Sequence, residues 1–103
     1  MRKIEITNYS YGFSSNSSVN RVTLSLFNQD QMVCLIFFYD KKSTQFPFMA
    51  GNDIVLLEYD ISWLDNIVDM LRNEKPVYFF INNNGSYYLS TEEEPVGEEE
   101  LQQ

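Results

Sequence analysis

Met32-Val-Cys-Leu-Ile-Phe-Phe-Tyr39 is the longest apolar run in the chain. It is far shorter than the roughly 20 residues that a membrane-spanning helix needs, but its length suits a β-strand. Side chains alternate between the two faces of a strand, so a run that is apolar throughout predicts a central strand. Such a strand is covered on both faces or has one face in a dimer contact. Cys34, the only cysteine, lies in this run, and we expect it to be a buried structural residue.

The residues on either side of this run predict two neighbouring strands. Apolar and polar residues alternate over residues 22–26, and the polar residues 28–31 predict a turn before the central run. Residues 54–59 predict a fourth strand, after a loop over residues 40–53. Large apolar residues are unusual in a solvated loop, so we expect three of them to fold back over one end of the core: Phe46, Phe48 and Met49.

The first segment of the chain alternates in two phases. Ile4 and Ile6 occupy alternate positions, and the aromatic residues that follow occupy the opposite phase: Tyr9, Tyr11 and Phe13. Because a shift of one residue moves side chains to the other face of a strand, the change near Thr7 and Asn8 has two interpretations. It predicts a β-bulge or a strand that crosses between two packing environments.

One amphipathic helix is predicted between residues 61 and 73. Its apolar residues recur at helical spacing and should pack on the sheet: Ile61, Leu64, Ile67, Val68 and Leu71. Asp60 or Ser62 is the predicted N-cap, and Asp65 follows Ser62 at the spacing of a capping box. Pro76 should end the helix.

A hairpin is predicted at residues 77–82 and 86–91, because Asn84-Gly85 is typical of a type I′ turn. That turn would place Ile81 opposite Tyr88 and Phe80 opposite Leu89. The complete prediction is a single α+β domain over residues 1–91. It has a curved, mainly antiparallel β-sheet in the order β-β-β-β-α-β-β, packed on one amphipathic helix, and it is followed by an acidic C-terminal tail, residues 92–103.

The negative charge of the chain is concentrated in this tail. The net charge is −8, but residues 1–91 hold nine acids against seven bases, and the tail holds six glutamates and no cation. A block of like charge resists burial and is often an interaction segment. The tail therefore indicates a partner with a basic surface.

Several classes of enzyme are excluded by composition and motif. The chain has no histidine, which removes the commonest general base and an ordinary metal ligand. It also lacks a glycine-rich phosphate loop, a nucleophile elbow and a cysteine or histidine metal set. Asp65, Asp69 and Arg72 share one helical face, but a solvated face explains them better than a magnesium site. We therefore predict no enzymatic activity, no metal and no cofactor. The first residues lack the apolar run of a secretion signal, which favours a cytoplasmic protein without a membrane partner.

The preferred hypothesis is a small acidic protein-interaction module that binds a basic protein surface. An inhibitor of the immunity or anti-defence type would fit this size and charge. The residues assigned to partner binding are Glu92, Glu93, Glu94, Glu98, Glu99, Glu100, Asp65 and Asp69.

The alternative hypothesis is a single-stranded nucleic-acid-binding domain with a self-inhibitory acidic tail. Its stacking platform would use the aromatic residues of the predicted strands: Tyr9, Tyr11, Tyr78, Phe80, Tyr87 and Tyr88. The basic residues are scattered along the chain and the net charge is negative, so electrostatics disfavours this alternative.

Overall fold

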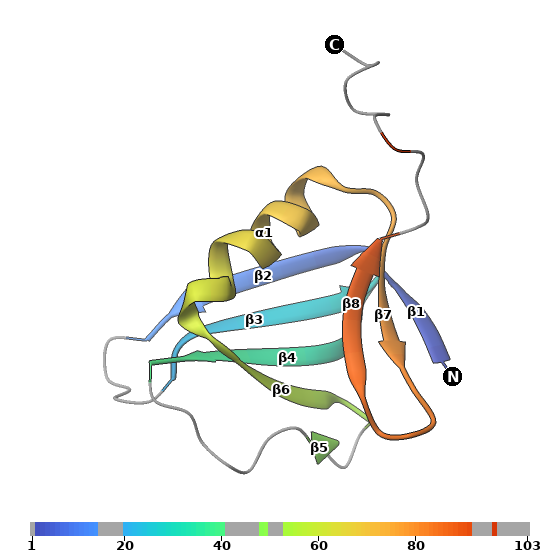
Figure 1. Cartoon of the computed structure of the whole chain (residues 1–103), viewed down its shortest axis with the longest axis horizontal. Helices are drawn as coiled ribbons and strands as arrows, with labels where there is room; N and C mark the ends of the chain where they lie inside the picture. Colours follow the sequence, from blue (N-terminus) through green and yellow to red (C-terminus); the bar gives the residue numbers. More distant parts are fainter. Residues whose placement is uncertain (1, 15–19, 41–47, 50–52, 92–95, 97–103) are drawn as a thin grey trace.

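A computed structural model describes residues 2–14, 20–40, 48–49, 53–91 and 96 (Figure 1). The elements within these residues are β1 (Arg2–Ile6), β2 (Asn8–Phe13), β3 (Asn20–Asn28), β4 (Gln31–Tyr39), β5 (Phe48–Met49), β6 (Val55–Asp60), the 3₁₀ turn η1 (Ile61–Trp63), α1 (Leu64–Asn73), β7 (Val77–Ile81) and β8 (Tyr87–Thr91). The α+β class and the single helix predicted from the sequence are confirmed.

The strands form two sheets where the sequence predicted one. The larger sheet has the order β2-β3-β4-β6-β5, and the smaller has the order β1-β7-β8. All pairs are antiparallel except β4 with β6. A parallel pair needs a crossover connection of about a dozen residues or more, which residues 40–54 supply. The long apolar strand β4 lies between β3 and β6, so its central position is confirmed.

Thr7 separates β1 from β2 and thereby separates the two sheets. Its backbone N–H donates to the carbonyl of Phe27 at 2.8 Å, and its Oγ1 accepts from the Gln29 N–H at 2.6 Å. The side-chain amide of Asn28 donates to the Glu5 carbonyl at 2.9 Å. The break is therefore fixed by the turn between β3 and β4. Of the two interpretations of the phase change, the strand that crosses between packing environments is confirmed.

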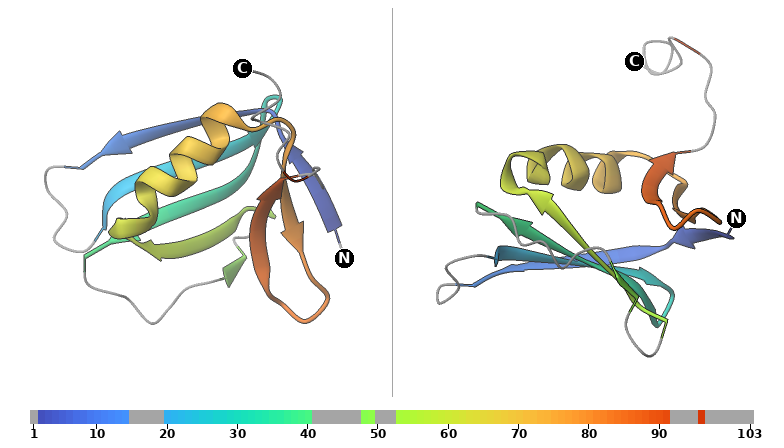
Figure 2. Two further views of the ribbon diagram at one scale, coloured as in Figure 1. Left: turned by 45° about the horizontal axis from the view of Figure 1, so that its top comes forward. Right: turned by 60° about the horizontal axis from the view of Figure 1, so that its bottom comes forward.

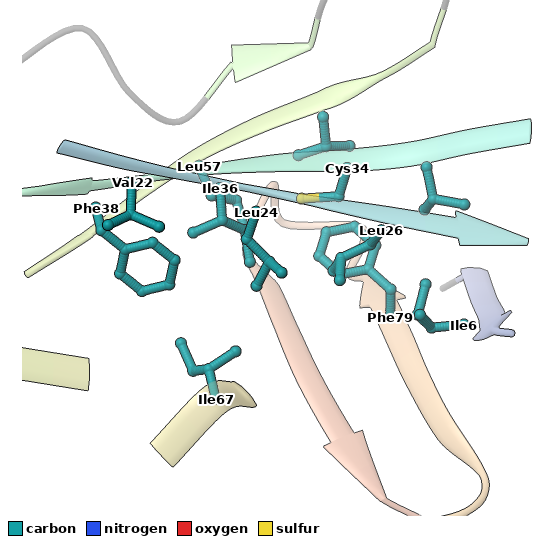
Figure 3. Close-up of a cluster of buried hydrophobic side chains, with 12 residues drawn as sticks. Ile6, Val22, Leu24, Leu26, Cys34, Ile36, Phe38, Leu57, Ile67 and Phe79 are labelled. Carbon is teal, nitrogen blue, oxygen red and sulfur yellow. The ribbon is translucent and has the colours of Figure 1, made fainter. Parts of the chain in front are cut away.

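The core lies on one face of the larger sheet, where both α1 and the smaller sheet cover it (Figure 2). Figure 3 shows Ile67 of α1 and Phe79 of β7 pointing toward a layer of side chains from β3 and β4. That layer consists of Val22, Leu24, Leu26, Cys34, Ile36 and Phe38. Cys34 is fully buried, and its burial raises the pKa of the thiol well above the ordinary value. The prediction that Cys34 is buried is confirmed.

The opposite face of β4 carries Leu35, Phe37 and Tyr39, which are only half-buried. The predicted cover is thus confirmed for the face of β4 that points toward α1 and the smaller sheet, and the other face is only partly covered. The dimer contact proposed for the other face stays a prediction. In the loop before β6, Phe48 and Met49 pair with β6, whereas Phe46 lies outside the described residues.

The helix has the predicted orientation. Ile67 and Val68 are buried, and Leu64 and Leu71 pack against the core while partly exposed. The polar side, which includes Asp65, Asp69 and Arg72, is exposed. The helix ends at Asn73, before Pro76, as expected.

Of the two predicted N-cap residues, Asp60 makes a side-chain capping hydrogen bond, whereas Ser62 does not. Asp60 caps η1 by accepting the Ser62 N–H at 2.9 Å. Hydrogen bonds from the backbone and side chain of Ser62 lower the pKa of Asp60 below its ordinary value of 3.8. The N-cap of α1 itself is Trp63, which makes no side-chain capping bond. The Ser62–Asp65 capping box is therefore wrong, because a 3₁₀ turn precedes the helix.

The hairpin is confirmed, but its register is one residue away from the prediction. The N–H of Gly85 donates to the Asn82 carbonyl at 3.1 Å, and the Asn82 N–H donates to the Ser86 carbonyl at 2.9 Å. Within the described hairpin Gly85 alone has a positive φ, of 86°. A type I′ turn needs two such residues. The loop thus has three residues, and the facing pairs are Ile81 with Tyr87, Phe80 with Tyr88 and Phe79 with Leu89.

Replacing Gly85 with valine should lower the free energy of unfolding by about 1 to 2 kcal/mol, because a β-branched residue is strained at positive φ. No atom lies within 4 Å of a Cβ built at Gly85, so the cost comes from the backbone alone. Gly12→Val is the matched control: Gly12 is in β2, where a Cβ also meets nothing within 4 Å. Urea denaturation measures both variants, and equal midpoints would contradict the turn.

Candidate functional site

Side chains of strand β2 and helix α1 line a groove, and the two elements are neighbours in Figures 1 and 2. One part of the groove has a volume of about 300 Å³ and is lined by Tyr11, Phe13, Leu64, Asp65, Val68, Asp69 and Arg72. The second part, of about 570 Å³, shares Arg72 and continues past Tyr9 and Leu71 toward the junctions of β1 with β2 and of α1 with β7. The groove therefore follows most of the length of the helix.

The β2 side of the groove is aromatic. Tyr9 and Tyr11 stack with ring centroids 6.5 Å apart, and Phe13 meets Tyr11 edge-on at 6.0 Å. These residues share a face with the buried side chains of β3, since Tyr11 pairs with Leu24 and Phe13 with Val22. Tyr11 and Phe13 nevertheless remain 42% and 73% exposed. Their exposure follows from the position of β2, which has a paired strand on one side only.

The helix side of the groove is charged. Asp65 and Asp69 are four residues apart, and both are exposed. Asp69 Oδ1 accepts a hydrogen bond from the side-chain amide of Asn73 at 2.7 Å, which helps to fix its position. Within the described part of the chain, no ion pair joins Arg72 to either aspartate. Both carboxylates are therefore available to a cation in the groove.

The structure brings two of the predicted partner-binding residues, Asp65 and Asp69, into one site with exposed aromatic rings. The other six are Glu92, Glu93, Glu94, Glu98, Glu99 and Glu100, and they lie outside the described residues. Phe13, the most exposed of the groove aromatics, was missed as a candidate residue. The sequence does show aromatic residues at alternate positions over residues 9–13. Their relevance to a site becomes clear only once β2 is placed beside α1.

The six aromatic residues of the alternative hypothesis do not form one surface. Tyr9 and Tyr11 line the groove, whereas Tyr87 stacks on Phe79 at 6.0 Å and packs against the core. The remaining three lie on the outer face of the smaller sheet: Tyr78, Phe80 and Tyr88. Phe80 and Tyr88 are nearly parallel, with centroids 4.8 Å apart, and Lys3 Nζ lies 4.2 Å from the centroid of the Tyr78 ring.

Two further features bear on the type of site. Across residues 2–14, 20–40, 48–49, 53–91 and 96, no three cysteine or acidic side chains come close enough to hold a metal ion. The described residues also include no helix with the length and apolar character needed to cross a bilayer.

Comparison of the chain with protein families, curated proteins and solved structures finds no significant match, so the groove itself is the basis for a functional proposal.

Proposed function

We propose that this protein is a small protein-binding module that holds a basic segment of a partner in the groove between β2 and α1. The single observation that carries this proposal is the placement of exposed aromatic rings opposite two carboxylates, Asp65 and Asp69. A lysine or arginine side chain suits both walls of such a groove. Its aliphatic stem packs on Tyr11 and Phe13, and its charged end reaches a carboxylate.

Each of these contacts is weak on its own. An exposed ion pair contributes about 0.2 to 1 kcal/mol, and an exposed cation–π contact about 0.5 to 1 kcal/mol. Useful affinity therefore needs several basic residues in one segment. The six glutamates of the tail would add long-range attraction, which acts mainly on the rate of association. An inhibitor that covers a basic, nucleic-acid-handling surface is the role that this combination favours.

A short labelled peptide of alternating lysine and threonine is the probe for this proposal. We expect Asp65→Asn with Asp69→Asn to weaken its binding about tenfold, because two charge contacts are lost. Asp30→Asn with Asp53→Asn is the matched control, since both of these aspartates are exposed and neither lines the groove. Equal loss in the two double variants would mean that only net charge matters, and it would refute the site.

The same titration tests the role of the tail. Removing residues 92–103 should slow association of the peptide more than it speeds dissociation, and added salt should act in the same direction. An unchanged association rate would remove the tail from the proposal while leaving the groove in it.

A second candidate function rests on the outer face of the smaller sheet. The parallel rings of Phe80 and Tyr88 beside Lys3 could stack with bases, at about 1 to 3 kcal/mol for each base. A single-stranded oligonucleotide is therefore the second probe in the titration. If truncation of the tail raises oligonucleotide binding, Tyr88→Ala abolishes the gain, and peptide binding is unchanged, the second candidate replaces the first.

A further inference from the structure

We infer that the partner segment enters the groove as an added β-strand, paired with the free edge of β2. This inference rests on the proposed function, and it specifies the partner as an extended segment with basic side chains at alternate positions. Main-chain hydrogen bonds would supply part of the affinity in this mode, and alternate side chains would supply specificity.

Strand β2 is the edge most open to pairing among the described strands. Natural edge strands are usually short, charged or interrupted by proline, which prevents unwanted pairing. β1 carries Arg2, Lys3 and Glu5, and β5 has two residues. β8 has five residues and is followed in the sequence by three glutamates. β2 has six residues, Asn8-Tyr-Ser-Tyr-Gly-Phe13, with neither a charge nor a proline.

The spacing of the two aspartates fits an added strand. Side chains on one face of a strand repeat every second residue, or about 6.6 to 6.8 Å. Asp65 and Asp69 are four residues apart on α1, which corresponds to about 6 Å along the helix axis. Basic residues at positions i and i+2 of the added strand can therefore meet one carboxylate each. Their stems would lie on the face of the sheet that carries Tyr11 and Phe13.

Charge decides between the candidate occupants of this edge. The acidic tail of the chain has no cation, so the groove carboxylates would repel it. A second copy of the chain would bring a net charge of −8 and its own Asp65 and Asp69 to the same edge. In the part of the groove that Tyr11 and Phe13 line, two carboxylates outnumber the single guanidinium of Arg72, so a basic partner segment has complementary charge and is the occupant that we propose.

The test uses the full chain, the lysine–threonine peptide and two N-methylated forms of that peptide. One form is methylated on alternate backbone nitrogens in one phase, and the other in the opposite phase. All three peptides have the same charge. In an added strand only one phase of N–H groups faces β2, so we expect one methylated form to lose at least about tenfold in affinity and the other to bind like the parent.

The outcomes separate this inference from the proposed function. If both methylated forms bind like the parent and Asp65→Asn with Asp69→Asn still weakens all three, the groove binds a basic segment without strand pairing, and the inference is wrong. If the parent peptide does not bind, both the proposed function and the inference fail.

Two further measurements complete the test. A peptide of the same composition with its lysines at consecutive positions places them on opposite faces, so it should bind about tenfold more weakly; equal binding would contradict the alternate spacing. Sedimentation of the protein alone should show no self-association that depends on Phe13, the exposed aromatic residue at the end of β2. A dimer that Phe13→Ala dissociates would assign the edge to a second copy and overturn the inference.

Discussion

Phe79→Ala is expected to lower the free energy of unfolding by about 3 to 5 kcal/mol, a large fraction of the total stability of a small domain. Phe79 is fully buried, stacks on Tyr87 at 6.0 Å and lies on the middle strand of the smaller sheet. It joins this sheet to the layer of β3 and β4 side chains (Figure 3). Its loss leaves a cavity between the two sheets, and urea denaturation measures the effect.

Phe80→Ala is the matched control for this variant. Phe80 is the next residue of β7 and has the same side chain, but it points to the outer face, where it stacks on Tyr88. Its loss should cost roughly 1 to 2 kcal/mol. If the two variants were equally unstable, our assignment of the inner and outer faces of the smaller sheet would be wrong.

Ile67→Asp should cost more than about 4 kcal/mol, because it places an unpaired carboxylate between α1 and the larger sheet. Ile67 is 8% exposed and contacts the core layer from the helix side. We expect this variant to be largely unfolded at room temperature. Its circular dichroism spectrum and its thermal transition give the measurement.

Asn66→Asp introduces the same charge one residue earlier on the exposed side of α1. Its effect should stay within about 0.5 kcal/mol. A strong loss of stability in both variants would show that added negative charge, rather than the buried face of the helix, is responsible.

Elements whose pattern is local were predictable from the sequence. The spacing of apolar residues over 61–71 defined the buried face of α1, and the phase change at Thr7 indicated the change of packing environment. Pro76 marked the end of the helix. In these cases the side-chain period alone determines which face is buried.

Features that depend on one backbone torsion were harder to predict. Asn84-Gly85 fits a two-residue turn, but the structure uses a three-residue loop in which Asn83 also takes part. The resulting register places Tyr87 inside and Tyr88 outside. The N-cap was also hard to predict. Asp60 and Ser62 are both good capping residues, and only the structure shows that a 3₁₀ turn begins after Asp60 and precedes α1.

The groove could be predicted only in part. Asp65 and Asp69 were recognisable as an exposed pair from helical spacing. Phe13 belongs to the site only because β2 lies at the sheet edge beside α1, and this position depends on contacts between segments far apart in the chain. No local sequence pattern predicts which segment lies beside β2.

The pairing of β1 with β7 joins the two ends of the folded domain, since Arg2 faces Ile81. Closing a loop of this length costs entropy before any contact in the smaller sheet is gained. Contacts of such large sequence separation are typical of domains that fold slowly. On a ribosome, β1 would leave the exit tunnel long before its partner strand exists. We therefore expect Ile4 to stay exposed to water until β7 is synthesised, and the smaller sheet to assemble last.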